Sequence, residues 1–529
     1  MKRTLFIIAV FSLITGFAHA QGKEADPKAA NEKFNAKNFG EALEDYLDLL
    51  ENDPRNDKYN YRVAVCYLNT EIGKAKAIPY LEIVTRQPKY EPDAMFLLGR
   101  AYQFGYRFDD AIKAFNKFKQ DGKGSSENLK DVDTEIQYCY NAKELMKFPL
   151  NVAFENLGKN INSEFPDYFG FVPSDESFIV FNSRRSEGKV KNPDGTYNSS
   201  IYISKTKDGQ YQKSKPMPSP VNSNAGDAEV VGLSANGDVM LIYYNDFQTE
   251  DDIYISLGDK NNNFKKPERL PDNINSPKGL EIAASVTADG STVYFASYRS
   301  GGMGGTDLYM SHKLPTGEWG PAQNLGAEIN TAQNEDFPNI SPDGKTLYFS
   351  SSGHTSMGGY DIFKADWDEA TQKWVNVKNM GYPINTPDDD YNFRISKSGR
   401  YGYISSSGPP TAKDKTFGDL DIYRVTFNDV EPEYTVISGG VTCVDTLKKV
   451  NYPDVFITVT DTKSGEIYGN YSPNPNSGRY VIILPPGQYN LSVEAAGYKS
   501  WADKLTIADK GSVKKEIPRD LKLTPEGTK

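Results

Sequence analysis

The sequence predicts a chain of three parts, namely an all-α helical repeat, a five-bladed β-propeller and a small β-sandwich. Three observations carry this prediction. An Ile/Val-Asn-Ser/Thr phrase occurs five times in the middle of the chain, with successive copies 60, 53, 55 and 55 residues apart. Before it, Ala and Pro recur every 34 or 35 residues, and after it come short alternating strands with Gly and Pro turns. Self-similarity at these periods indicates stacked helical units and propeller blades.

The first 20 residues are expected to be a secretory signal peptide. Lys2 and Arg3 form its basic start, residues 4–17 are mainly apolar, and Ala18-His19-Ala20 has the small residues of a cleavage site. A short membrane anchor is the alternative, but the apolar run is too short to span a bilayer. No Cys follows the cleavage site, so no lipid anchor is expected. We therefore expect an exported, periplasmic protein, with outer-membrane association left open.

The net charge limits the classes of binding partner, and the cysteine count limits the number of disulfide bonds. The formal net charge is −11, which argues against nucleic acid or anionic lipid as the main partner. The three cysteines are Cys66, Cys139 and Cys443. We interpret them as small packed side chains rather than a disulfide framework, which would need more cysteines in an even number. A free thiol with a role is the alternative.

Residues 26–148 show a helical period. Ala42, Ala77 and Ala111 recur at 35 and 34 residues, and residues 97–102 read Leu-Leu-Gly-Arg-Ala-Tyr. This pattern resembles the tetratricopeptide (TPR) repeat, with three repeats and a closing helix near residues 131–147. The resemblance implies a concave groove for a peptide or partner segment. A purely structural N-terminal cap is the alternative.

Residues 150–430 are predicted to form the five blades. In each copy a tight turn, often Asn-Gly or Asp-Gly, separates two β runs, which is a hairpin signal. An orphan copy at residues 152–158 precedes the first complete blade, and the fifth blade lacks its last strand. We expect this orphan strand to complete the fifth blade and close the ring.

Residues 341–350 (Ser-Pro-Asp-Gly-Lys-Thr-Leu-Tyr-Phe-Ser) and 357–363 (Met-Gly-Gly-Tyr-Asp-Ile-Phe) resemble the TolB-type, WD40-like PD40 repeat. In that family the Asp before the Ile-Tyr strand braces the blade. The resemblance therefore implies structural roles for Asp252, Asp307, Asp361 and Asp421. A sialidase-type Asp box is rejected, because residues 341–346 are one residue short between Asp and Gly.

Residues 434–524 form a separate module. Short alternating strands with Gly and Pro turns indicate a small β-sandwich. Their spacing resembles the carboxypeptidase regulatory-like, transthyretin-like domain. The resemblance implies a spacer or an adhesion or folding aid.

No catalytic, cofactor or metal site is predicted. Of three histidines, His19 leaves with the signal peptide, and His312 and His354 are interpreted as surface loop residues. No nucleophile elbow, His-x-x-x-His, Cys-x-x-Cys or phosphate loop occurs. The acidic runs 250–252 and 388–390 lack the spacing of a calcium loop, so we interpret them as solvated turns, with a bound hard cation as the alternative.

Taken together, the three parts resemble PorE-type envelope proteins of Bacteroidetes, which belong to the type IX secretion and gliding machinery. Those proteins carry a further OmpA-like peptidoglycan-binding domain, whereas this chain ends at Lys529 just after the sandwich. The leading hypothesis is a non-catalytic periplasmic scaffold without cofactors, which binds envelope proteins through the helical groove and a propeller face. One rival is a propeller hydrolase or lyase acting on glycans or peptides, which would need a deep pocket with paired carboxylates and Arg, Tyr or His. The other rival is a TolB-like envelope-integrity protein.

Overall fold

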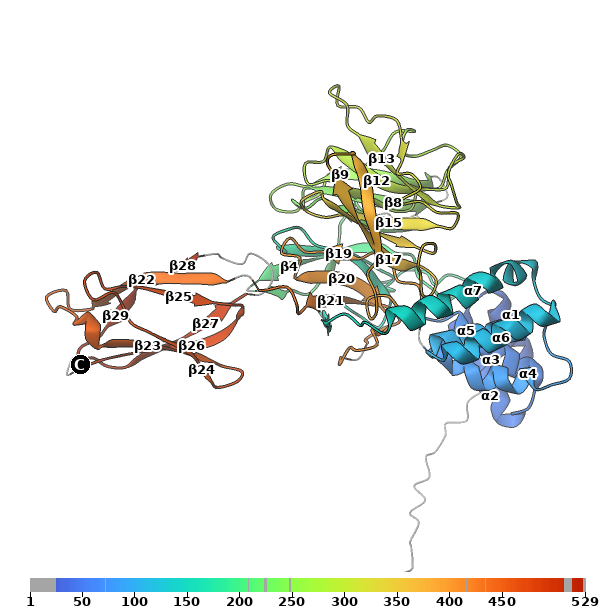
Figure 1. Ribbon diagram of the computed structural model, residues 1–529, viewed down its shortest axis with the longest axis horizontal. Helices are drawn as coiled ribbons and strands as arrows, with labels where there is room; N and C mark the ends of the chain where they lie inside the picture. Colours follow the sequence, from blue (N-terminus) through green and yellow to red (C-terminus); the bar gives the residue numbers. More distant parts are fainter. Residues whose placement is uncertain are drawn as a thin grey trace, which may run out of the picture.

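The computed structural model describes residues 25–526 except 72, 208, 223–225, 247–248, 415, 433 and 509–515. Along the chain a helical part is followed by a stack of β-sheets and then by a separate two-sheet module (Figure 1). The predicted signal peptide lies outside the described residues. Within the described ranges, no helix has the length and apolar character needed to cross a membrane.

The helical part consists of three helix pairs and a closing helix. In order these are α1 (Pro27–Asn35), α2 (Phe39–Asn52), α3 (Asp57–Leu68), η1 (Lys74–Ala77), α4 (Ile78–Thr85), α5 (Ala94–Phe104), α6 (Phe108–Asp121) and α7 (Ser126–Leu145). Small residues allow neighbouring helices to approach closely: a Cβ on Gly99 would lie 2.5 Å from the ring of Phe115. Helix α7 begins five residues earlier than expected, because Ser125 caps it by accepting a hydrogen bond from Asn128 N.

Residues 152–427 form five antiparallel sheets. The first contains β2 (Asp167–Phe171), β3 (Phe178–Ser183), β4 (Ser200–Lys207), β5 (Gln210–Tyr211) and β6 (Lys215–Pro216). The second sheet contains β7 (Gly226–Leu233), β8 (Val239–Asp246), β9 (Thr249–Leu257) and β10 (Glu268–Arg269). The third contains β11 (Ala284–Val286), β12 (Thr292–Ser297), β13 (Asp307–His312) and β14 (Gln323–Asn324). The fourth contains β15 (Glu335–Ile340), β16 (Thr346–Ser351), β17 (Asp361–Asp368) and β18 (Lys373–Asn379). The last contains β19 (Arg394–Ile395), β20 (Tyr401–Ser406), β21 (Asp421–Phe427) and β1 (Val152–Asn156).

The five recurring Asn side chains link each sheet to the next. Asn222 accepts a hydrogen bond from Ile201 N at 2.8 Å and donates one to Ile201 O at 2.9 Å. The same two bonds join three further pairs, namely Asn275 with Ile253, Asn330 with Leu308 and Asn385 with Ile362. In every case the partner lies in the third strand of the preceding sheet. The repeated phrase is therefore a clamp between consecutive sheets.

The ring closes through two contacts of the same kind. Asn162, in the first copy of the phrase, clamps Ile422 in β21 of the last sheet at 2.9 and 3.0 Å. Strand β1 pairs antiparallel with β21, with Val152 opposite Phe427 and Asn156 opposite Tyr423. The prediction that the orphan strand completes the last sheet is confirmed. This pairing covers the edge of β21 that would otherwise be open at the seam.

The Asp residues before the Ile-Tyr strands hold the loops that lead into them. Asp361 accepts hydrogen bonds from Met357 N and Asn379 Nδ2, and Asp421 accepts them from Phe417 N and Asn156 Nδ2. Asp307 accepts bonds from Met303 N and Gly304 N, whereas Asp252 pairs with Arg269. Asp307, Asp361 and Asp421 thus make the bracing contacts that the resemblance implies, whereas Asp252 instead links β9 to β10.

The C-terminal module is built from two sheets around one apolar core. One sheet contains β22 (Thr435–Cys443), β25 (Arg479–Leu484), β28 (Glu516–Pro518) and β29 (Leu521–Leu523). The other contains β23 (Val455–Asp461), β24 (Ile467–Tyr471), β26 (Gly487–Ala495) and β27 (Trp501–Ile507). Alternate residues of both sheets, such as Ile457 and Ile482, are fully buried between them.

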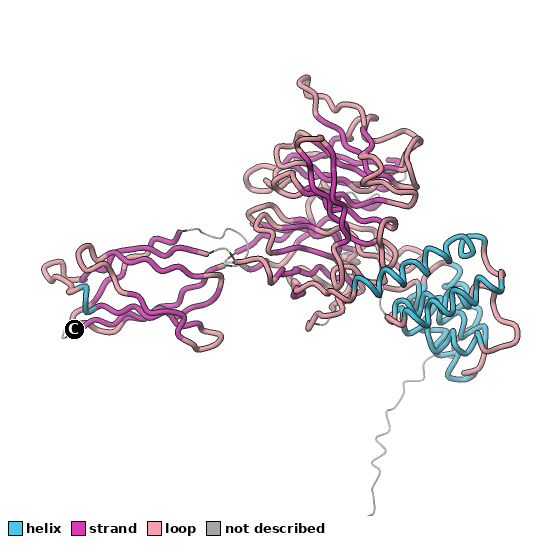
Figure 2. Tube along the Cα trace, viewed as in Figure 1, coloured by secondary structure: helices cyan, strands magenta, loops and turns pink. Residues whose placement is uncertain are grey.

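The helical part packs directly against the sheets, as Figure 2 shows for the end of the helices nearest the strands. From α7, Tyr138 donates a hydrogen bond to Ser352 O and Asn141 donates one to Ser356 O at 2.8 Å. Met357, from the loop before β17, is fully buried in the apolar cluster of the helices. The rings of Tyr106 and Tyr382 meet edge to face at 6.1 Å.

Candidate functional site

A cavity of about 800 Å³ lies between the helical part and the sheets. Its helical wall comes from the turns after α1, α3 and α5 and includes Glu71, Lys74 and Phe104. Its opposite wall comes mainly from the first and last sheets, which meet at the ring seam. This wall includes Tyr168, Arg184, Glu229, Asp388, Asp389, Tyr391, Ser405 and Asp419. The volume falls within the range of small-molecule and peptide-side-chain pockets.

A row of five aromatic rings, on and next to the inner strands, lies beside this cavity. Successive ring centroids of Tyr168, Phe169, Phe337 and Tyr391 are each 5.0 Å apart, and Tyr360 follows at 5.2 Å. Phe169 and Phe337 have positive φ values of 54° and 47°, at positions where the strand register shifts. Such bulges re-aim side chains at the cost of local strain. Three of these rings, Tyr168, Phe169 and Tyr391, line the cavity.

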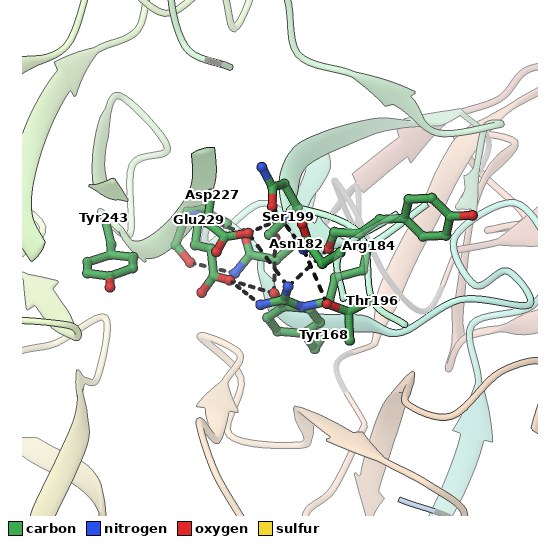
Figure 3. Close-up of polar contacts among 12 residues, drawn as sticks. Tyr168, Asn182, Arg184, Thr196, Ser199, Asp227, Glu229 and Tyr243 are labelled. Atoms are coloured by element: carbon green, nitrogen blue, oxygen red, sulfur yellow. Dashed lines mark hydrogen bonds and ion pairs between the residues drawn. The ribbon is translucent and has the colours of Figure 1, made fainter. Parts of the chain in front are cut away.

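A polar network joins the first and second sheets at the cavity wall (Figure 3). Tyr168 donates a hydrogen bond to Glu229 Oε1 at 2.6 Å, and its hydroxyl lies 3.0 Å from Ser199 Oγ. The Arg184 guanidinium lies 3.5 Å from Glu229 and 3.6 Å from Asp227. Burial raises the pKa of Glu229, although Arg184 opposes this rise. Each of these groups is thus already bound to another protein group.

The acidic run 388–390 forms a second part of the same wall. Asp388 pairs with Lys74 of the helical part at 2.5 Å, and Asp389 accepts a hydrogen bond from Tyr360 N at 2.9 Å. Asp390 accepts one from Thr386 N at 2.6 Å, and burial raises its pKa well above the usual range. The interpretation of this run as a solvated turn therefore holds only in part: Asp389 is exposed in an irregular loop, but all three carboxylates contact protein at the domain boundary.

The other acidic run has a different role. Residues 250–252 lie in strand β9, so they do not form a turn. Asp251 accepts a hydrogen bond from Tyr243 at 2.6 Å, and Asp252 pairs with Arg269. In the part of the chain that the structure describes, no group of three or more His, Cys, Asp or Glu side chains is arranged to hold a metal ion.

Comparison with known proteins finds only distant structural similarity. No family model and no curated protein matches the chain. Among solved structures it is similar to TolB from Acinetobacter baumannii, with 14% identity, covering 57% of this chain and 70% of that one, at a TM-score of 0.31. It is also similar to the periplasmic gluconolactonase of Pseudomonas aeruginosa, with 9% identity, 65% and 86% coverage and a TM-score of 0.27. A puromycin hydrolase has 10% identity, 68% and 55% coverage and a TM-score of 0.27.

The strand pairing decides the fold. The chain is a β-propeller protein. Its propeller carries the helical part on the face formed by the loops around residues 352–358 and 386–391. One propeller face is therefore partly covered by the protein's own helices, and the cavity lies between the two.

The remaining residues singled out in the sequence lie outside this cavity. His354 is exposed and its Nε2 lies 2.9 Å from Ile329 O. His312 is the last residue of β13 rather than part of a loop, and its Nδ1 lies 2.9 Å from Thr292 Oγ1. Cys66, Cys139 and Cys443 are buried and unpaired, so their interpretation as packed side chains is confirmed. Burial raises the pKa of the Cys66 and Cys139 thiols to about 12.

Sequence reasoning did not find Tyr168, Arg184 and Glu229. Tyr168, Glu229 and Asp336 occupy corresponding positions of three inner strands, opposite Asn182, Tyr243 and Ser350. A difference between the repeats could have pointed to these residues. The ends of the strands are alike in every repeat, whereas the positions of Tyr168, Glu229 and Asp336 carry a phenol and two carboxylic acids.

Proposed function

We propose that this protein is a non-catalytic periplasmic scaffold of the bacterial cell envelope. In this proposal the five sheets are the blades of a five-bladed propeller, and the helix pairs are TPR-like repeats. An accessory role in the type IX secretion or gliding machinery is the form of this proposal that the sequence resemblance favours. The predicted signal peptide supports export.

One observation carries the proposal: two different parts of the chain jointly wall the cavity of about 800 Å³. Neither wall forms it alone, because the turns of the helical part face the seam of the propeller. Ligand sites are common at such domain boundaries. The charged groups of the polar network are bonded to one another, as expected for a preorganised binding surface.

A propeller hydrolase is the second candidate, because the cavity contains features that it requires. Carboxylates, Arg184 and three tyrosines line the cavity. In the network, however, Glu229 accepts a hydrogen bond from Tyr168, and Asp227 accepts one from Ser199 N at 2.5 Å. A general acid or base must instead reach a substrate proton. A TolB-like envelope role differs from the leading proposal only in the partner that it predicts.

Affinity capture from envelope extract tests the proposal. The mature full-length protein is expected to retain the same envelope protein in repeated experiments. A variant carrying Tyr391→Ala and Phe104→Ala, which removes rings from both walls, is expected to retain less of it. Hydrolysis of a glycan or peptide panel that is lost in Glu229→Gln would favour the enzyme. Absence of any reproducible protein partner would overturn the scaffold proposal.

A further inference from the structure

We propose that the cavity binds a basic peptide segment, with a lysine or arginine side chain held between Asp389 and Asp419 beside the aromatic wall. This inference rests on the proposed partner-binding function and names the chemistry of the partner.

Negative charge is in excess across the domain boundary at the cavity. Glu71 of the helical wall lies within electrostatic reach of Asp388, Asp389 and Asp419 of the propeller, and Lys74 is the cation opposing them at Glu71. Arg100 is within reach of Asp388 and Asp389 as well, but it is already paired with Glu135. Lys74 is already paired with Asp388 at 2.5 Å. Burial is the main cause that raises the pKa of Glu71, and the three propeller carboxylates raise it further. Two parts of one protein thus bring like charges together across a cavity, which is unfavourable until a cation enters.

Asp419 lies on the propeller wall of the cavity. Its carboxylate has neither an ion pair nor a hydrogen bond within the described residues, and partial burial raises its pKa. Its side chain is nevertheless accessible from the cavity. Asp389 is also exposed there; its carboxylate contacts Tyr360 N and the Tyr391 hydroxyl and keeps its remaining lone pairs. Both carboxylates can therefore accept hydrogen bonds from a ligand.

An aromatic ring of this cavity, that of Phe104, already contacts two cations. Lys74 Nζ lies 5.3 Å from the ring centroid of Phe104, and the Arg100 guanidinium lies 4.8 Å from it. Both distances are within the range of cation–π interactions. On the opposite wall Tyr391 stands next in sequence to the acidic run and lines the same cavity. A basic side chain entering there would find the same pairing of carboxylate and ring that Lys74 uses.

An extended basic side chain fits these groups better than a metal ion does. The described carboxylates are not gathered into a cluster that could coordinate a metal. A lysine or arginine side chain instead has several donors and can bridge separated acceptors. The cavity is large enough for such a side chain with neighbouring backbone.

Titration of the mature protein with a blocked Lys-Lys-Lys peptide tests this inference, with blocked Gln-Gln-Gln as the uncharged probe. We expect single-site calorimetric binding of the lysine peptide that weakens as salt is raised from about 50 to about 300 mM. Asp389→Asn with Asp419→Asn should weaken it about tenfold or more, which corresponds to one lost charged contact. Glu318→Gln with Glu328→Gln removes the same charge from exposed positions outside the cavity and should change it little.

Equal losses in both double variants, or no binding of the lysine peptide, would overturn the inference. Binding of a neutral chitin oligosaccharide at the cavity in place of the lysine peptide would also overturn it. If partner capture still depends on Phe104 and Tyr391 in these cases, the proposed scaffold function stands and only the ligand class is wrong. If capture fails as well, the function itself is wrong.

Discussion

The guanidinium carbon of Arg394 lies 3.9 Å from the ring centroid of Phe171, so the last sheet of the propeller contacts the first through its inner strands. The same guanidinium donates hydrogen bonds of 3.3 Å to Val231 O and Pro338 O, in two further sheets. The residue is only 5% exposed, and burial lowers its pKa well below the usual range. One side chain thus holds inner strands of four sheets together.

We expect the packing of Arg394 to matter more than its charge. Arg394→Ala should leave a central void and destabilise the propeller by about 2–4 kcal/mol. Arg394→Met keeps most of the volume and removes a buried cation that has no carboxylate partner among the described residues, so its cost should be about 1–3 kcal/mol smaller. Urea unfolding followed by tryptophan fluorescence measures both. Equal costs for the two variants would show that the charge, rather than the volume, is required.

The closure of the ring predicts a specific crosslink. Ala153 in β1 lies opposite Thr426 in β21, and directly opposed residues of antiparallel strands are close enough for a disulfide. Ala153→Cys with Thr426→Cys should therefore form a bond on mild oxidation, detectable as a linked peptide by mass spectrometry. Ala153→Cys with Thr346→Cys, which places the second thiol in another sheet, is the control and should not. A linked peptide only in the control pair would contradict the assignment of β1.

Met357 is expected to hold the helical part on the propeller. It is fully buried among residues of α5, α6 and α7, so Met357→Ala should cost about 2–4 kcal/mol at this interface. Hydrogen exchange should then rise in α7 while the sheets stay protected. The control Met217→Ala lies in the core between the first two sheets and should instead raise exchange there. Unchanged exchange in α7 of the Met357 variant would argue against a stable interface.

Asp336 should make stability depend on pH. Burial raises its pKa to about 7, whereas an unfolded chain has an Asp pKa of about 4. The folded state therefore binds the proton of the Asp336 carboxyl more tightly than the unfolded chain does. The stability that this protonation contributes is fully present below pH ~4 and is lost as the pH rises through about 7. Relative to Asp336→Asn, the wild type should lose stability between about pH 5 and pH 8. Urea midpoints of both proteins at the two pH values measure this, and parallel pH profiles would contradict it.

The residues that could be predicted from the sequence are those that do the same task in every repeat. Asn162 and its four counterparts clamp neighbouring sheets, and Asp361 and its counterparts brace loops, so their recurrence at a fixed period revealed both the blade boundaries and the orphan strand. A contact that every repeat makes requires the same residue type at the same position of every repeat.

The cavity could not be predicted in this way. Phe104 and Lys74 lie in the helical part, whereas Tyr391 and Asp419 lie in the propeller, and no sequence period relates the two pairs of residues. Their proximity depends on how the helical part docks, through contacts such as the bond from Asn141 to Ser356 O, more than 200 residues away in sequence. The same docking places residues 388–390, expected to be a solvated turn, on a cavity wall where Asp388 pairs with Lys74 while Asp389 stays exposed.

Photo-crosslinking in the cell envelope tests the central claim most directly. A benzophenone amino acid would be placed at Asn69 on the helical wall, at Ser407 on the propeller wall, or at Glu318 outside the cavity. The account predicts that both cavity positions crosslink to the same envelope protein and that the Glu318 position does not. Adducts at Glu318 alone, or none from either wall, would contradict the claim that the helices and the propeller bind a partner between them.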